Sequence, residues 1–407
     1  MTAQAATIRL AEAAEAPIPV LTHDEAVAAA RALGPRIRAR AERADADRQL
    51  PRESVEEMVE AGLFGVTMPR RYGGSGLGFD SLVEVATEIG SACGSSGWVY
   101  GVLAGHNIMA ALFSQKAQAE IFADPRVLIS TVFRLAGKVS PEDDGYRLTG
   151  GEGRFCSGVD FAQWVMVGNA VQRDGQPPEP GFFLVPISEV EVVDDWFTAG
   201  MRGTGSKTIK IADAYIPPHR FIRQSDIQKG ETPGAAFLGE PRYRLPTGMS
   251  QPFSLIGAAL GLARGAVREF ADNLGKRCGS QSAEQIGEQS ATFARLAAVS
   301  AEADAAFTIV MDNARMIDGS DDPAAFTLVQ RAKIKRDVAY AAQKARHAVN
   351  SLFEASGGSG IYDGAPLQRM WRDINGATAH VAFTWDVAAS NYGRAIAGLP
   401  PSKFTPV

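Results

Sequence analysis

The stretch at residues 366–385, PLQRMWRDINGATAHVAFTW, lies close to the end of the chain and decides how the fold is interpreted. Pro366 suits the first position of a helix, where its missing N–H leaves no hydrogen bond unmade. Apolar residues then recur at three- and four-residue spacing, at Leu367, Met370, Trp371, Ile374 and Ala377. The pattern predicts one amphipathic helix up to Trp385, with His380 near its buried stripe. A histidine there is either a hydrogen-bonded core residue or part of a functional site.

Composition places the chain among globular proteins. It has 407 residues, enough for two or three domains with hydrophobic cores. Hydrophobic residues make up 45% and charged residues 21%, and the net charge of −5 provides no basic surface for nucleic acid. There is no run of about 18 apolar residues, so neither a transmembrane helix nor a membrane partner is expected.

Cysteine and histidine usage favours a reducing compartment and no metal site. Cys93, Cys156 and Cys278 are far apart and odd in number, which argues against a disulfide framework. The five histidines are scattered, and no Cys/His cluster has the spacing of a zinc site. Residues 1–17 lack the basic-then-apolar layout of a signal peptide. A cytoplasmic location is therefore expected.

The apolar period changes twice along the chain. Helical spacing continues to about residue 125, with helix starts near Thr22 and Pro51. Between residues 126 and 222, short runs such as VLISTVF, WVMVGNAV and TIKIADAYI predict strands. After a connector at residues 224–248, four apolar stripes predict antiparallel helices. We therefore predict an α+β fold with an N-terminal helical domain (1–125), a central β-barrel or β-sandwich domain (126–230) and a C-terminal four-helix bundle (231–407).

Two motifs resemble the acyl-CoA dehydrogenase superfamily. GGSGIYDGAPLQRMWRD at residues 357–373 has its Gly-Gly turn, proline and Arg-Asp pair, and PRRYGGSG at 69–76 resembles a common N-terminal turn. True dehydrogenases carry a glutamate base about two helical turns after the Arg-Asp pair. Here residues 377–383 hold His380 and no carboxylate, and the alternative position at 249–256 also lacks an acid. The chain therefore resembles the flavin-dependent two-component monooxygenases of this fold, such as 4-hydroxyphenylacetate 3-hydroxylase and the dibenzothiophene monooxygenases.

A third motif, GEGRFCSGVDFAQWVMVG at residues 151–168, carries the implied flavin contacts. In the related monooxygenases a similar aromatic-x-Ser-Gly stretch lies against the flavin ring. The resemblance implies that Phe155 packs on the isoalloxazine and that Ser157 bonds near its N5. Gly158 would let the backbone approach the flat ring closely. Without the resemblance, Ser157-Gly158 is an ordinary turn at the end of a strand.

Further cofactor contacts follow from the same resemblance. The first predicted strand lies beside the flavin in the superfamily, which implies contacts from Thr131 and Phe133. AGMRGTGSK at residues 199–207 resembles a superfamily loop before the last strands, which implies contacts from Thr204 and Ser206. Arg277 is predicted in the loop where superfamily members place an arginine on the neighbouring subunit's cofactor.

Three charged or titratable residues have two interpretations each. Arg202 and Lys207 either favour a flavin phosphate or are solvated loop charges. His106 lies within the apolar helix VYGVLAGHNIMAALF, where a buried imidazole needs a hydrogen-bond partner. It is either a core histidine bonded to a backbone carbonyl or a substrate contact, since the related monooxygenases carry a histidine at what looks like the matching place.

The resemblance implies an oxygenase component that receives reduced FAD or FMN from a separate flavin reductase, since the chain has no nicotinamide-binding fingerprint. Reduced flavin and O₂ give a C4a-hydroperoxide in such enzymes, and an aromatic phenol or indole-type substrate is hydroxylated. Ser157 would hold N5–H, His380 would act as the acid or base, and His106 would contact the substrate. A homotetramer is implied. An acyl-CoA dehydrogenase with an unusual base, a non-enzymatic flavin carrier and an S- or N-oxygenating monooxygenase are the alternatives.

Overall fold

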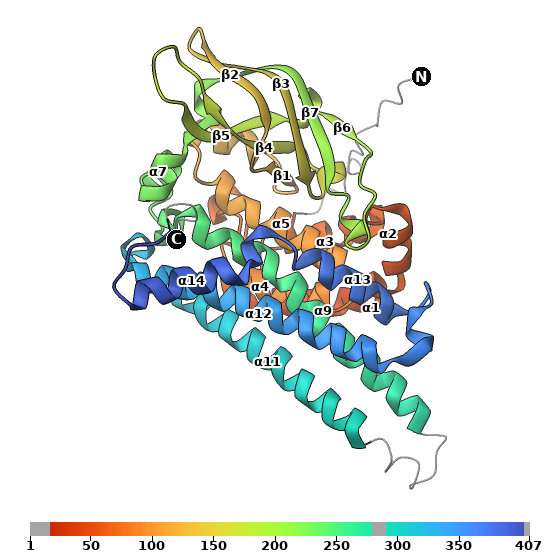
Figure 1. Ribbon diagram of the computed structural model, residues 1–407. Helices are drawn as coiled ribbons and strands as arrows, with labels where there is room; N and C mark the ends of the chain where they lie inside the picture. Colours follow the sequence, from red (N-terminus) through yellow and green to blue (C-terminus); the bar gives the residue numbers. More distant parts are fainter. Residues whose placement is uncertain (1–16, 279–289, 403–407) are drawn as a thin grey trace.

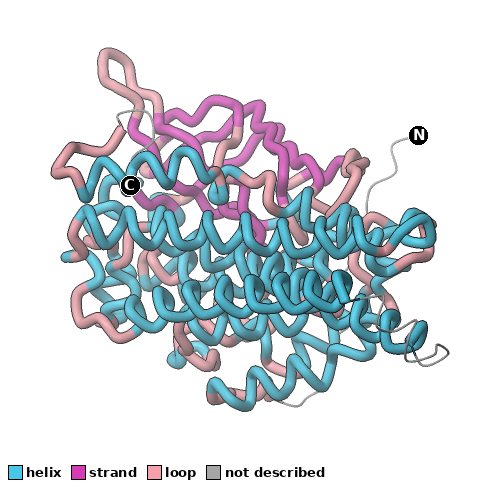
Figure 2. Tube along the Cα trace, turned by 60° about the horizontal axis from the view of Figure 1, so that its bottom comes forward, coloured by secondary structure: helices cyan, strands magenta, loops and turns pink. Residues whose placement is uncertain are grey.

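Eight β-strands form a layer that lies against a thick layer of helices, as Figures 1 and 2 show. The computed structural model describes residues 17–278 and 290–402. Helices from both ends of the chain make up the helical layer, and strands from the middle of the chain cover one side of it. The predicted order of helices, strands and helices is confirmed.

The N-terminal helices begin where the sequence predicts. The Thr22 hydroxyl accepts the backbone N–H of Glu25, whose carboxylate accepts the N–H of Thr22 in return. This reciprocal cap satisfies two of the N–H groups that a helix start leaves unpaired. The helices are α1 (His23–Ala39), α2 (Ala41–Asp47), α3 (Arg52–Glu60), α4 (Phe79–Gly90), α5 (Gly94–Ala110) and α6 (Gln115–Ile121).

The strands form one sheet in the order β6-β7-β3-β2-β4-β5-β8, and β1 pairs with β4 in parallel. Antiparallel hairpins join β2 to β3 and β4 to β5. The strands are β1 (Ile129–Val132), β2 (Ala136–Glu142), β3 (Gly145–Cys156), β4 (Trp164–Val171), β5 (Glu179–Pro186), β6 (Glu191–Val193), β7 (Lys207–Ile216) and β8 (Phe221–Arg223). The domain limits at residues 125 and 230 stay predictions.

The connector after the sheet contains two short helices, α7 (Gln224–Lys229) and α8 (Pro233–Leu238). Three long helices follow and run back and forth across the molecule (Figure 1). They are α9 (Thr247–Cys278), α11 (Ser290–Asp318) and α12 (Leu328–Ala355). Two shorter helices, α13 (Pro366–Ala377) and α14 (Trp385–Ile396), take the place of the predicted fourth long helix.

The prediction of one helix up to Trp385 is therefore wrong. The helix α13 ends at Ala377, and His380 precedes a short 3-10 turn at Val381–Phe383. Two side chains satisfy backbone groups at the break: the Thr378 hydroxyl donates to the Ile374 carbonyl, and His380 accepts the Ala382 N–H. Hydrogen bonds from side chains to nearby backbone groups compete with the continuation of a helix. The spacing of apolar residues does not reveal such bonds.

The helices of both ends share a single hydrophobic core, while the sheet encloses a second, smaller core. Close packing between α5 and α9 depends on glycine. A Cβ on Gly101 of α5 would lie 2.3 Å from the backbone carbonyl oxygen of Ser254 in α9. Such spacing positions α5, which carries His106, directly against α9. No described helix is both long enough and apolar enough to cross a membrane.

Candidate active site

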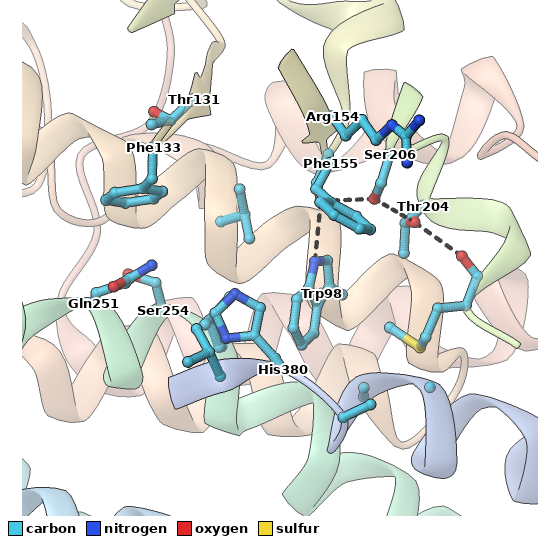
Figure 3. Close-up of a pocket in the computed structure, with 18 of the residues that line it drawn as sticks. Trp98, Thr131, Phe133, Arg154, Phe155, Thr204, Ser206, Gln251, Ser254 and His380 are labelled. Atoms are coloured by element: carbon cyan, nitrogen blue, oxygen red, sulfur yellow. Dashed lines mark hydrogen bonds between the residues drawn. The ribbon is translucent and has the colours of Figure 1, made fainter. Parts of the chain in front are cut away.

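A cavity of about 1330 Å³ opens between the sheet and the helical layer (Figure 3). On the sheet side its lining comes from β1, from β3 and from the loop at residues 196–206. On the helical side it comes from α5, from the first turns of α9, from α13 and from the segment that joins α13 to α14. Segments that are far apart in the sequence therefore meet around one space.

Most of the predicted site residues line this cavity: His106, Thr131, Phe133, Phe155, Ser157, Thr204, Ser206 and His380. Arg277 is predicted in a loop, and this prediction is wrong. The residue lies in the last turn of α9 (Thr247–Cys278). The position of its side chain lies outside the part of the chain that the structure describes.

A bulge near the end of β3 places Phe155 in the cavity. The pairing register of β3 with β7 shifts between Gly153 and Cys156, and Phe155 has a positive φ of 67°. Its ring is 69% exposed and makes an edge contact with Trp196, with ring centroids 6.0 Å apart. An aromatic face held open in this way is available to a planar ligand.

Gly158 packs against α5. It does not line the cavity, and its φ is +69°. A Cβ at this position would lie 3.1 Å from side-chain carbons of Leu103 and Val99 in α5. The glycine therefore allows a left-handed turn to pack on α5, and its contact with a flavin ring stays a prediction.

Three hydroxyl groups form a hydrogen-bonded row along the cavity wall. Ser157 Oγ lies 2.7 Å from Ser206 Oγ, which lies 2.7 Å from Thr204 Oγ1. Trp98 Nε1 of α5 donates to Ser157 Oγ at 3.2 Å, and Thr204 Oγ1 donates to the Met201 carbonyl oxygen at 2.8 Å. Figure 3 shows this row as dashed lines from Trp98 through Ser206 to Thr204 and beyond. All four side chains are buried.

The two histidines of the cavity offer opposite hydrogen-bonding groups. His106 Nδ1 lies 2.7 Å from the Ile129 carbonyl oxygen, so Nδ1 carries the proton and Nε2 is an acceptor. Burial lowers the pKa of His106 to about 4, which keeps the ring neutral. His380 Nδ1 accepts the Ala382 N–H at 3.1 Å, so Nε2 of the neutral ring is a donor. Burial lowers the pKa of His380 as well. Both interpretations of His106 therefore hold, since it bonds a carbonyl and lines the cavity.

Sequence reasoning missed several residues that organise the cavity. Trp98 bonds Ser157 and also packs against His380, with ring centroids 5.8 Å apart. Asp373 Oδ1 accepts the Met201 N–H at 2.6 Å, and Arg372 binds both carboxylate oxygens of Asp45 in α2. The Arg-Asp pair was visible as a motif, but only its partners reveal that it fixes the loop beside the cavity.

The interpretation of Arg202 and Lys207 as phosphate-binding groups is not supported by their contacts. Lys207 Nζ bonds Asp160 at 2.7 Å and is buried, while Arg202 donates to backbone carbonyls of Asp45 and Thr198. Neither residue lines the cavity. Among the described residues around the cavity, the only carboxylate is that of Glu152, which is exposed on β3.

Comparison with known proteins agrees with this geometry. Residues 22–123 match the family described as acyl-CoA dehydrogenase, N-terminal domain, and residues 254–385 match the acyl-CoA dehydrogenase C-terminal domain. The flavin-dependent monooxygenase oxygenase subunit HsaA of Mycobacterium tuberculosis is 34% identical over 374 residues, which cover 90% of this chain and 94% of HsaA. The FADH2-dependent resorcinol hydroxylase oxygenase component of a Rhizobium species is 32% identical, with 89% and 92% covered.

Solved structures agree as well. XiaF from a Streptomyces species, solved in complex with FADH2 and glycerol, matches with a TM-score of 0.84 and 26% identity over 93% of this chain and 96% of XiaF. The fold is that of the acyl-CoA dehydrogenases. The chain belongs to the family of oxygenase components of flavin-dependent monooxygenases, and it is an enzyme of that class. The family and fold predicted from the sequence are thereby confirmed.

Proposed function

We propose that this chain uses reduced flavin and O₂ to hydroxylate an aromatic substrate with a phenol or indole-type ring. The observation that carries the proposal is the cavity itself, which combines the exposed face of Phe155, the hydroxyl of Ser157 and two neutral histidines of opposite hydrogen-bonding character. The resorcinol hydroxylase relative, which is named for a phenolic substrate and for FADH2, supports the same assignment.

The residues around the cavity fit a flavin. The buried hydroxyl of Thr131 has no hydrogen-bond partner within the described residues although Thr131 lines the cavity, so it is open to a polar atom of a bound group. Phe155 offers an aromatic face, and Ser157 offers a buried hydroxyl oxygen at the cavity wall. When bound, a reduced flavin supplies the two electrons and the ring that activates O₂. We assign Phe155, Thr131 and Ser157 to holding it, with Phe133, Thr204 and Ser206 around them.

The two histidines orient the substrate and move its proton. His106 Nε2 accepts the hydroxyl or ring N–H of the aromatic substrate, because its other nitrogen is committed to Ile129. His380 Nε2–H donates toward the reacting oxygen, because its Nδ1 is committed to Ala382. An activated ring is electron-rich at the carbon next to such a hydroxyl, which favours hydroxylation there. Both rings line the cavity, so a flavin and a substrate bound there would displace water from around the reacting atoms.

The test is a coupling measurement with a flavin reductase, NADH, O₂ and a panel of phenols and indoles. The wild-type chain should give hydroxylated product with little H₂O₂. Ser157→Ala should release several times more H₂O₂ per flavin oxidised, because it loses the oxygen that holds N5–H. Complete loss of O₂ as H₂O₂ by the wild-type chain with every aromatic substrate would refute the proposal. Bleaching of bound oxidised flavin by an acyl-CoA would instead favour the dehydrogenase alternative.

Reductase, assembly and location complete the proposal. A separate reductase supplies the flavin, as the two-component relatives imply. We propose a homotetramer in the cytoplasm, which sedimentation velocity and cell fractionation test directly. A monomer at micromolar concentration would rule out the tetramer without affecting the assignment of the cavity.

A further inference from the structure

The row of hydroxyls beside the cavity has a fixed direction. Its two ends are Trp98 Nε1, which only donates, and the Met201 carbonyl oxygen, which only accepts. Each hydroxyl between them has a single proton to donate. Thr204 gives its proton to Met201 and therefore accepts from Ser206, which in turn accepts from Ser157.

Ser157 is consequently left without a free proton. Its hydroxyl donates to Ser206 and accepts from Trp98, so the only valence left on Ser157 Oγ is one lone pair. All four side chains, Trp98, Ser157, Ser206 and Thr204, line the cavity and are less than 9% exposed. Burial matters here because water would otherwise supply alternative partners and let the protons reorient.

The accepting end of the row is anchored from several directions. Met201 has a positive φ of 55°, which is unfavourable for a residue with a side chain. The buried carboxylate of Asp373 accepts its N–H at 2.6 Å, and Trp196 Nε1 donates to its carbonyl oxygen at 3.0 Å. These contacts hold the carbonyl in the position in which Thr204 reaches it.

We propose that Thr204 and Ser206 are positioning residues that make Ser157 an obligate hydrogen-bond acceptor, so that the cavity prefers a flavin that carries a proton on N5. The proposal rests on the proposed function. Reduced flavin has an N5–H that can donate to Ser157, whereas N5 of oxidised flavin carries a lone pair that faces another lone pair. The enzyme would thereby hold its reduced co-substrate and release the oxidised flavin to the reductase.

Removing the hydroxyl of Thr204 should free the direction of the row. In Thr204→Val, Ser206 loses its acceptor and turns its proton toward Ser157, which can then donate into the cavity. Oxidised flavin then gains a hydrogen bond that the wild-type row denies it, while reduced flavin keeps its own, because the freed Ser157 hydroxyl can still accept from N5–H. The ratio of the dissociation constants of oxidised and reduced flavin should fall about tenfold, as expected for one hydrogen bond. Ser206→Ala should act in the same direction, since it also leaves the Ser157 proton without its acceptor.

The experiment is an anaerobic equilibrium dialysis of full-length protein against FAD and against dithionite-reduced FAD. It measures binding and needs no turnover. Thr204→Ser keeps the hydroxyl and should restore the wild-type ratio. Thr198→Val is a matched control, because the Thr198 hydroxyl also donates to a backbone carbonyl beside the cavity but lies outside the row. It should leave the ratio unchanged.

The outcomes separate this proposal from the proposed function. If wild type binds reduced FAD and the ratio stays constant in both Thr204→Val and Ser206→Ala, the direction of the row does not govern binding, and the proposal fails alone. A Thr204→Ser variant that behaves like Thr204→Val also contradicts it. If wild type binds neither FAD nor FMN in either redox state, both proposals fail. If Thr204→Val does not fold, the ratio of dissociation constants measured for Ser206→Ala tests the proposal.

Discussion

Asp373 provides a sharp test of how the loop beside the cavity is held. Its carboxylate is 3% exposed and accepts the Met201 N–H at 2.6 Å. Burial raises the pKa of Asp373 to about 6, and the nearby charge of Asp45 acts in the same direction. Asp373→Asn removes the charge but keeps an oxygen that can accept the Met201 N–H. The variant should fold, and it should gain stability relative to wild type as the pH rises.

The sign and size follow from the pKa difference between folded and unfolded chains. An unfolded Asp has a pKa of about 3.9, so the folded protein holds the proton more tightly between about pH 4 and 6. The contribution of Asp373 to stability therefore falls as the pH rises through this window. A shift of about two units corresponds to about 3 kcal/mol in full, and about 2 kcal/mol of it should develop between about pH 4.5 and 7.

A comparison of the two proteins isolates this effect. His106, with its pKa lowered to about 4, contributes the opposite slope, but it is present in both proteins and cancels. Urea unfolding followed by tryptophan fluorescence should be measured at several pH values. Asp174→Asn, an exposed residue of the turn between β4 and β5, serves as the control. A stability difference between wild type and Asp373→Asn that stays constant with pH would refute the reasoning.

Two further predictions concern the histidines and the helix contact. His106→Ala should raise KM for the aromatic substrate and leave flavin binding intact. His380→Ala should lower the amount of product per flavin oxidised, with reduced flavin still bound. Steady-state kinetics measures KM and product yield, and dialysis measures flavin binding. If both variants behave alike, the donor and acceptor roles are wrong. Gly101→Ala should destabilise the fold by about 1–3 kcal/mol and lower Tm, because the new Cβ meets the Ser254 carbonyl at 2.3 Å. Gly275→Ala in α9, with open space around it, should be neutral or stabilising, and equal effects at both positions would contradict the packing argument.

Local patterns were sufficient for the architecture. The capping residue Thr22, the alternating runs of the middle segment and the apolar stripes of the later helices all act within a few residues, so the sequence predicts them. The break after Ala377 escaped this reasoning. It depends on hydrogen bonds of Thr378 and His380, which an apolar stripe does not report.

The motifs also located most of the candidate site. Ser157 and Phe155 were found from one stretch, and both line the cavity. The packing of Gly158 on α5 could not be predicted, because the glycine motif carries no information on which helix lies next to it. Trp98 and Asp373 were missed because their partners lie 59 and 172 residues away.

By itself, the sequence determined the order of helices and strands, the family and several polar residues at the cavity, such as Ser157, Ser206 and His380, because each of these is written in short stretches of chain. Tertiary structure alone decided what those residues offer to a ligand. The proton of Ser157 is committed through Ser206 and Thr204 to Met201, and the tautomers of His106 and His380 are set by the backbone groups of Ile129 and Ala382. Hydrogen-bond direction depends on partners brought together from distant segments, and no local pattern encodes it.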